Sequence, residues 1–217
     1  MLYMSEMKFC INLLPLGKLL FNIVMNLNHV EKVFSLRVIS GTRKGCALKT
    51  LKGKTTRPTM DKVKEAIFNM IGPYFSGGMA LDLYGGSGGL GIEALSRGIE
   101  KVIFVDYDIR ACQIIKENLQ KTKFLDRSEV YRNDARRALK ALAKRKLQFD
   151  YIFLDPPYEN EHIEDDIMFI EEHELLCENG TIVVEHHRSV ALKDEIGSLK
   201  LERREQYGDT MISLYKK

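Results

Sequence analysis

Four consecutive residues, Asp155-Pro156-Pro157-Tyr158, have the chemistry needed to hold a flat ring that carries an amino group. They follow the apolar run 151–154, which is typical of a buried strand. The Asp155 carboxylate and the Pro156 carbonyl can accept the two amino hydrogens, and the Pro156 ring fixes the direction of its backbone. Tyr158 can stack on the ring. The alternative is a plain strand-to-loop turn, in which the prolines only end the hydrogen-bonded ladder.

Such a grip favours methylation of the amino nitrogen. The nitrogen of an amino group on a nucleobase is a weak nucleophile, because its lone pair is delocalised into the ring. Two acceptors favour a pyramidal nitrogen whose lone pair can point at a methyl donor, and most of the rate then comes from in-line placement. A base inside a helix would first have to be flipped out.

A glycine-rich loop, 85–91, follows an earlier strand-like run. Its glycines allow a tight turn and close approach to a ligand, and Gly86-x-Gly88-x-x-Gly91 has the spacing of a dinucleotide-type loop. Asp106 ends the next strand-like run, where an acid can bind ribose hydroxyls. The loop therefore predicts a site for an adenosine cofactor.

Two cofactor classes, NAD and S-adenosylmethionine, fit this pattern, because both present an adenosine ribose. Asp82, at the start of the loop, favours S-adenosylmethionine, since an acid there repels a pyrophosphate and can pair with an ammonium group. Asp134 follows the third strand-like run and can reach the adenine amino group, cap the next helix, or do both.

Neither a metal site nor a disulfide framework is expected. The cysteines are far apart and form no CxxC pair, which is typical of reduced cytosolic thiols. His186 and His187 are adjacent on a predicted strand, so they point to opposite faces and make a poor chelate.

The composition is that of an ordinary globular protein, with 217 residues, 45% hydrophobic, 29% charged and a net charge of +3. The charge is uneven, because residues 37–64 contain nine basic residues and a single acid, Asp61. This block predicts either a surface that binds a polyanion in a salt-dependent way or a solvated basic loop.

Hydrophobic periodicity predicts the elements that position these motifs. Residues 35–51 are expected to form a hairpin with a basic tip, and Thr59 to cap a helix over 61–71. Beyond these, the expected strands are 80–84, 102–106, 129–131, 150–154 and 181–184, the expected helices are 90–97, 109–121, 135–145 and 163–176, and 199–207 with 211–215 form an antiparallel hairpin.

This alternation predicts a Rossmann-like α/β fold, and the glycine loop and the tetrapeptide together favour the class I methyltransferase type. The sheet is expected to be mostly parallel and seven-stranded, with a C-terminal antiparallel hairpin and a small N-terminal hairpin and helix arm. In such a sheet the ligand crevice lies at the carboxyl ends of the strands beside the switch point, so the glycine loop and Asp155 are expected to share one cleft.

Three segments are expected along the chain. Residues 1–34 form an N-terminal extension, either a non-native upstream start or a helix that packs on the domain or a partner. Its apolar run is too short for a membrane span and lacks a clear cleavage site. Residues 35–76 form the basic arm and 77–217 the methyltransferase domain, and we expect a cytoplasmic protein without a membrane segment.

Residues 82–98, together with the tetrapeptide at 155–158, resemble the bacterial RsmD family. The similarity extends upstream over 37–41, 57–59 and 62–65, and in all over about residues 36–215. The resemblance implies transfer of a methyl group from S-adenosylmethionine to the N2 of a guanine in 16S ribosomal RNA of the small subunit, conventionally G966.

The expected site residues fall into three groups. Those expected to bind the cofactor are Asp82, Tyr84, Gly86, Ser87, Gly88, Asp106 and Asp134. Those expected to hold the base are Asp155, Pro156, Pro157 and Tyr158. Those expected to contact RNA are Arg37, Arg43, Lys44, Lys49, Arg57 and Thr59, and the resemblance implies that Arg57 and Thr59 border the cleft.

Three alternatives remain on the residues alone. An adenine-N6 methyltransferase acting on DNA or RNA fits the tetrapeptide equally well, although the chain has little room for a separate target-recognition domain. A nicotinamide-dependent oxidoreductase needs neither the tetrapeptide nor the basic arm. A non-catalytic RNA-binding protein needs neither Asp106 nor Asp155. We expect a monomer acting on 16S ribosomal RNA within a small-subunit assembly.

Overall fold

The computed structural model describes residues 36–51, 58–157 and 162–217. These ranges belong to one compact unit, Ser35–Lys217. The expected extension 1–34 lies outside the described residues, as do Arg57 and Tyr158. Within the described ranges, no helix has the length and apolar character needed to cross a membrane.

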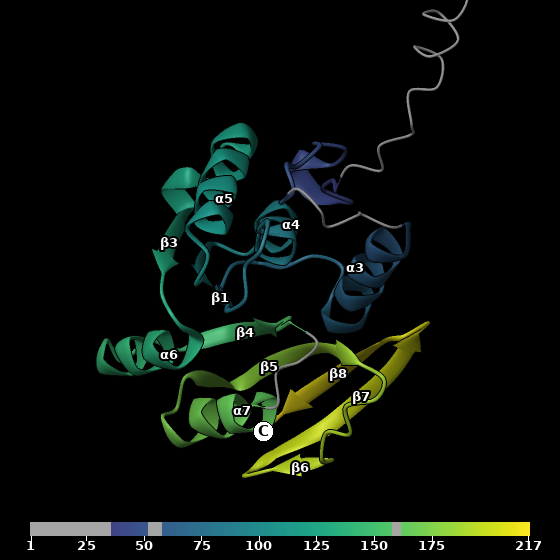
Figure 1. Cartoon of the computed structure of the whole chain (residues 1–217), viewed down its shortest axis with the longest axis vertical. Coiled ribbons are helices and arrows are strands. Elements are labelled where there is room, and N and C mark those ends of the chain that lie inside the picture. The colour runs from purple at the N-terminus through teal and green to yellow at the C-terminus, as the bar shows by residue number, and fades with distance from the viewer. Residues whose placement is uncertain (1–35, 52–57, 158–161) are drawn as a thin grey trace, which may run out of the picture. The chain divides into compact units, whose positions relative to one another are not determined.

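Eight strands form one sheet in the order β3-β2-β1-β4-β5-β8-β7-β6 (Figure 1). They are β1 (Met79–Asp82), β2 (Lys101–Asp106), β3 (Ser128–Arg132), β4 (Phe149–Leu154), β5 (Leu176–His187), β6 (Glu195–Ile196), β7 (Leu199–Tyr207) and β8 (Thr210–Lys216). Pairs from β3 to β5 are parallel, and pairs from β5 to β6 are antiparallel. The chain order reverses between β1 and β4, which makes this the switch point of the sheet.

The fold class expected from the sequence is confirmed, with one addition. The prediction of seven strands misses β6, which pairs with β7 at the outer edge. This strand has only two residues, so it carries no alternating pattern that sequence could reveal.

Five α-helices lie in the described ranges: α3 (Pro58–Ile71), α4 (Gly89–Arg97), α5 (Ile109–Thr122), α6 (Ala135–Lys144) and α7 (Ile163–Glu172). Two expected helix boundaries are wrong, and β5 extends beyond the expected 181–184 at both ends. Thr59 lies inside α3 rather than capping it, because the helix begins at Pro58, a residue suited to the first helical position. The last helix ends at Glu172 rather than at the expected residue 176. Leu175 and Leu176 are buried beside β4 instead: Leu175 O accepts Phe149 N, and Leu176 is in register with Phe149.

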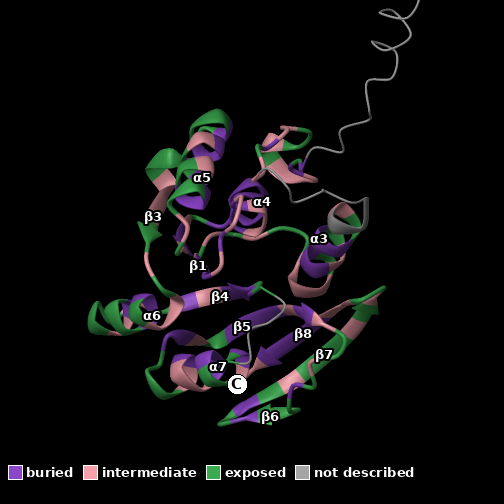
Figure 2. Ribbon diagram, viewed as in Figure 1, coloured by how far each residue is buried: buried purple, intermediate pink, exposed green. Residues whose placement is uncertain are grey.

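The two faces of the sheet are covered by different helices (Figure 2). Leu81 and Ile152 pack with the apolar sides of α6 and α7, whereas Phe104 and Phe153 pack with α3, α4 and α5. Neighbouring strand residues point to opposite faces, so strands buried on both sides are apolar throughout. Each such fully buried side chain contributes about 1.5–3 kcal/mol to folding.

The segment 36–51, called the arm below, turns back on itself as the expected hairpin does, but it has few of the hydrogen bonds of a β-ladder. A single bridge joins Arg37 to Ala47, and Val38 N donates to Cys46 O at 2.9 Å. The expected basic tip is a 3₁₀ turn, η2 (Gly41–Arg43). A Cβ added at Gly41 would lie 1.9 Å from Ser96 O, so the tip rests directly on α4.

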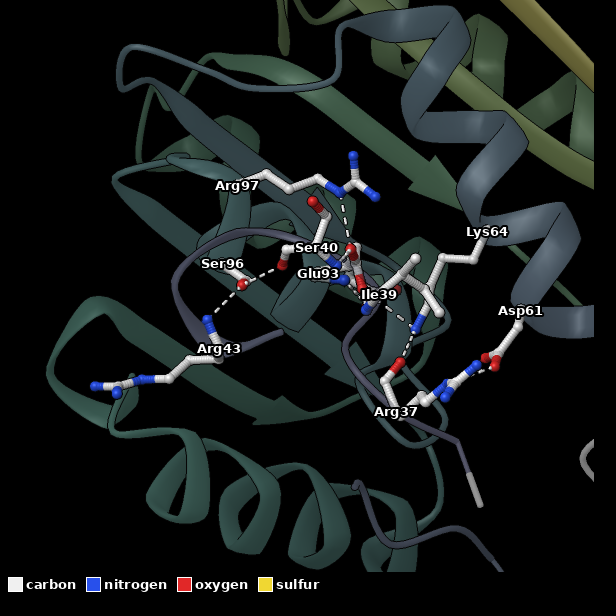
Figure 3. Close-up of polar contacts among 11 residues, drawn as sticks. Arg37, Ile39, Ser40, Arg43, Asp61, Lys64, Glu93, Ser96 and Arg97 are labelled. Carbon is white, nitrogen blue, oxygen red and sulfur yellow. Dashed lines mark hydrogen bonds and ion pairs between the residues drawn. The ribbon is translucent and has the colours of Figure 1, made fainter. Parts of the chain in front are cut away.

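A buried carboxylate fixes the arm to α4 (Figure 3). Glu93, with no exposed surface, accepts Ile39 N at 2.7 Å and Ser40 N at 2.9 Å. Two cations surround the same carboxylate: Arg97 Nε at 2.8 Å and Lys64 Nζ, from α3, at 3.4 Å. One side chain thus holds together the arm, α3 and α4.

Both cations also donate hydrogen bonds to backbone carbonyl groups. Lys64 Nζ donates to Arg37 O at 2.6 Å, and Arg97 Nη1 donates to Pro73 O at 3.0 Å. The Arg97 guanidinium also lies 4.8 Å from the centre of the Phe68 ring. Burial lowers the pKa of Lys64, and the charge of Glu93 opposes this change. A buried ion group is tolerated only when its members are paired and hydrogen-bonded in this way.

We predict that Glu93→Ala lowers the free energy of unfolding by about 3–5 kcal/mol, because it leaves Lys64 and Arg97 buried without a counter-charge. Urea denaturation followed by circular dichroism measures the change. The matched control is Glu117→Ala, which removes an exposed ion pair between α5 and Lys49 of the arm, at 2.6 Å. The control is expected to leave the unfolding midpoint nearly unchanged, and equal losses in the two variants would contradict the role of burial.

Candidate active site

Three acids lie at the carboxyl edge of the sheet on either side of the switch point. Asp82, the last residue of β1, is in register with Phe104 of β2 and Phe153 of β4. Asp106 and Asp155 each follow their register partner by two residues, or about 7 Å along the strand. The structure therefore brings the cofactor acids and the Asp-Pro-Pro end to one edge, as expected.

The glycine loop turns tightly over the ends of β1 and β2. Gly86 and Gly88 have φ of +54° and +78°, a backbone region that side-chain-bearing residues rarely occupy. Gly88 N donates to Gly85 O at 2.6 Å, and Gly85 N donates to Val105 O at 2.9 Å. Gly88 immediately precedes α4, so the loop leads into a helix N-terminus, as an adenosine-cofactor site requires.

Asp106 organises this loop as well as its own strand end. Its Oδ2 accepts Gly86 N at 2.8 Å and its Oδ1 accepts Asp108 N at 2.8 Å. A carboxylate oxygen can accept more than one hydrogen bond, so these contacts orient the group and leave acceptor capacity for hydroxyls. Tyr107, the next residue, is 73% exposed, and sequence reasoning assigned it no role.

Asp82 is almost fully buried behind the loop, and its Oδ2 accepts Gly91 N at 3.0 Å. Burial, with smaller contributions from the charges of Asp155 and Asp106, raises the pKa of Asp82 to about 8, although the Gly91 hydrogen bond opposes this change. A cation bound beside Asp82 would restore the ionised form, so the site fits the ammonium group of S-adenosylmethionine better than it fits a pyrophosphate.

Tyr84 links the loop to the opposite face of the sheet. Its hydroxyl donates to Asp166 Oδ2 of α7 at 2.6 Å, and Arg136 Nε of α6 lies 2.8 Å from Asp166 Oδ1. Asp166 is buried, and this burial raises its pKa. Asp134 caps α6 by accepting Arg137 N at 3.2 Å, and it remains exposed at the same edge. The capping role expected for Asp134 is therefore present.

The residues expected to hold the base begin where β4 ends. Asp155 and Pro157 are exposed, whereas Pro156 is buried. Asp155 is therefore open to solvent at the edge of the sheet, and Pro156 is packed in the interior. Tyr158 lies outside the described residues. Within the described ranges, no group of three or more His, Cys, Asp or Glu side chains is arranged to hold a metal ion.

Comparison with known proteins decides the family. A family model described as "Conserved hypothetical protein 95" matches residues 36–216. YlbH of Bacillus subtilis is 55% identical over 182 residues, 84% of this chain and 99% of that protein. "Ribosomal RNA small subunit methyltransferase D" of Haemophilus influenzae is 37% identical over 158 residues, 72% of this chain and 81% of that protein.

This chain belongs to the RsmD family. A solved structure, a conserved hypothetical protein from Streptococcus pyogenes, is 41% identical, with a TM-score of 0.67 over 70% of this chain and 93% of that one. The family, the fold class and the methyltransferase class predicted from the sequence are thereby confirmed.

The four arm residues that sequence assigned to RNA in this RsmD-family chain are engaged to different degrees. The Arg37 guanidinium pairs with Asp61 at 3.0 Å, Arg43 Nε donates to Thr122 O at 2.7 Å, and Lys49 pairs with Glu117. Lys44 is exposed, and in the described part of the chain no acid lies within ion-pair distance of it. For Thr59 only the backbone, in α3, is described.

Sequence reasoning missed Asn118, which connects the arm to the glycine loop. This residue of α5 has no exposed surface. Its Nδ2 donates to Ser87 O at 2.9 Å and to Lys49 O at 3.0 Å, and its Oδ1 accepts Lys49 N at 2.8 Å. No local signal could have revealed it, because one asparagine on a helix is usually a surface residue.

We predict that Asp82→Asn stabilises the ligand-free protein and weakens its binding of S-adenosylhomocysteine. A raised carboxyl pKa means that folding binds a proton, so wild-type stability falls as pH rises from about 4 to about 8 and then levels off. The amide has no such dependence, and the variant's advantage should grow by up to about 1.4 kcal/mol per pH unit over that window. Thermal unfolding at several pH values measures it, and parallel curves would show that Asp82 is ionised in the free protein.

We predict that Asn118→Ala costs about 1–3 kcal/mol of stability, because it leaves backbone groups of Lys49 and Ser87 without their partner. The loosened loop should also bind S-adenosylhomocysteine several-fold more weakly, which calorimetry measures on the folded fraction. Gln113→Ala, an exposed change on the same helix, is the control and should stay within about 0.5 kcal/mol of wild type. Unchanged cofactor affinity in Asn118→Ala would contradict the link.

Proposed function

We propose that this chain transfers a methyl group from S-adenosylmethionine to the exocyclic N2 of a guanine in 16S ribosomal RNA, conventionally G966. The observation that carries the proposal is the meeting of Asp82, Asp106 and Asp155 at one sheet edge, with the glycine loop over it. The name of the Haemophilus influenzae relative supports a small-subunit ribosomal RNA as the substrate.

The cofactor end of the site is built from loop and strand ends. S-adenosylmethionine supplies an electrophilic methyl group on a sulfonium. Asp82 pairs with its ammonium group, Asp106 accepts its ribose hydroxyls, and Asp134 lies at the edge where the adenine amino group is expected. Gly86, Ser87 and Gly88 form the backbone wall against which the methionine tail lies, and Tyr84 is held beside that wall by Asp166.

The base end of the site is the strand end of β4. Asp155 Oδ and Pro156 O accept the two hydrogens of the target amino group, so its lone pair is directed at the incoming methyl. Pro156 is buried and has a fixed φ, so its carbonyl direction is preset. Tyr158 stacks on the ring. As the carbon–nitrogen bond forms, the bond between the methyl group and the sulfonium breaks and S-adenosylhomocysteine is the leaving group. The nitrogen is then cationic and loses its proton to water, so no strong base is needed.

The choice of guanine rests on family resemblance, because two hydrogen-bond acceptors can bind the amino group of guanine or of adenine. An adenine-N6 methyltransferase is therefore the nearest alternative. We also propose that the protein acts as a cytoplasmic monomer on RNA within a small-subunit assembly. Residues 35–76, which include the arm and α3, serve it in substrate binding, and 77–217 form the methyltransferase domain.

The test is mass mapping of 16S ribosomal RNA from cells with and without the gene. A guanine methyl should be absent without the gene and be restored by the wild-type chain. A missing methyl on adenine would overturn the base assignment, and an unchanged methylation map would overturn the function.

We predict that Asp155→Ala lowers the methylation rate at least about 100-fold, because it removes one of the two acceptors that direct the lone pair of the amino nitrogen. S-adenosylhomocysteine affinity should stay within a few-fold of wild type, because the residue binds the base rather than the cofactor. Asp209→Ala, which makes the same truncation in the turn between β7 and β8, is the control and should keep full activity. Full activity in Asp155→Ala would remove the residue from the mechanism.

A further inference from the structure

A second strongly basic segment lies far from the arm in sequence. Residues 132–146, from the end of β3 through α6, contain seven basic residues and one acid, Asp134. Their net charge of +6 exceeds the +3 of the entire chain. The residues outside 132–146 must therefore have a negative net charge. The positive charge of the chain is concentrated in residues 37–64 and 132–146.

Two of the seven basic side chains are neutralised by neighbouring acids. Arg136 lies 3.0 Å from Asp165 and 2.8 Å from Asp166, and Arg145 lies 2.9 Å from Glu129. The other five are exposed, and within the described ranges no acid lies at ion-pair distance from them. We call these five the α6 basic surface: Arg132, Arg137, Lys140, Lys144 and Lys146.

Helical spacing places the middle three residues of this surface in one stripe. Arg137, Lys140 and Lys144 follow one another at intervals of three and four, so they project from the same side of α6. The opposite side carries Ala138, Leu139 and Leu142 into the core. From Arg137 to Lys144 the stripe runs about 10 Å along the helix.

The helix dipole favours a cation at Lys144, in the last turn of α6, but local structure does not favour the rest of the stripe. Arg137 is in the first turn of α6, where the helix dipole disfavours a cation. Lys140 and Lys144 are like charges four residues apart, which weakens a helix. An arrangement that costs stability and is left unpaired is suited to an external anion.

The α6 basic surface begins beside the proposed active site. Arg132 is in register with Asp106, and its Nε donates to Tyr107 O at 3.3 Å. The arm packs on the sheet face covered by α4 and α5, whereas α6 packs on the other face (Figure 1). The arm and α6 therefore place basic residues on both faces of the sheet, and Arg132 places one of them at the carboxyl edge.

We propose that the α6 basic surface binds the phosphate backbone of the substrate RNA beside the target base, where α6 begins next to the carboxyl edge. This rests on the proposed function for the identity of the polyanion. An acidic protein is the less suitable occupant, because protein interfaces are centred on apolar and aromatic anchors. The only apolar side chain exposed on α6 is Ala141.

The test is the salt dependence of binding to full-length 16S ribosomal RNA made by transcription. In Arg137→Gln/Lys140→Gln/Lys144→Gln, the slope of log affinity against log salt concentration should become shallower by about 2–3, and affinity near 0.1 M salt should fall at least about tenfold. The control with the same change of charge is Arg188→Gln/Lys193→Gln/Lys200→Gln, exposed residues outside the arm and α6, whose slope should match wild type. Both variants should bind S-adenosylhomocysteine as wild type does, which checks folding.

Three results would overturn the proposal. One is an unchanged slope in the α6 variant, and another is an equal change in both variants. The third is weaker binding to purified small subunits with an unchanged slope on naked RNA, which would identify an acidic protein instead. The binding experiment does not depend on methylation. An unchanged methylation map would therefore overturn the proposed function without deciding whether α6 binds RNA, and an unchanged salt slope would overturn the role of α6 without deciding the proposed function.

Discussion

The arrangement of the described unit depends on a carboxylate that has no access to water. Glu93 must be paired wherever it is buried, and its partners come from three directions: two backbone N–H groups of the arm, Lys64 of α3 and Arg97 of its own helix. Its helix, α4, begins at the glycine loop, so the requirement that positions the arm also fixes the helix behind the cofactor site. Asn118 repeats the arrangement from α5, where it binds the arm and Ser87 together.

Acidic and basic side chains lie in different parts of the described unit. Acids gather at the carboxyl edge, where Asp106 and Asp155 help to raise the pKa of Asp82 to about 8. Bases gather on the arm and on α6, on opposite faces of the sheet. The acids of the edge and the bases of the arm and α6 thus lie in separate regions, as the proposed binding of a cationic methyl donor and of a polyanionic RNA requires.

Much of the fold and of the site could be predicted because its signals are local. The glycine loop, Asp106 and the Asp155 strand end each lie in a short stretch whose residue types restrict the backbone, and parallel topology then brings them to one edge. The remainder depends on long-range packing. Glu93, Arg97 and Asn118 look like ordinary helix-surface residues in the sequence, and only tertiary contacts bury them. The end of α7 was misplaced because Leu175 and Leu176 continue a helical apolar pattern although the sheet buries them.

The order of the strands has a consequence for how the chain folds. β1 lies between β2 and β4, and its partner β4 is about seventy residues further along the chain. β8, the last strand in sequence, is an interior strand between β5 and β7. Contacts of such high sequence separation form slowly, because loop closure must precede them. During synthesis, the sheet can therefore be completed only after β8 has left the ribosome.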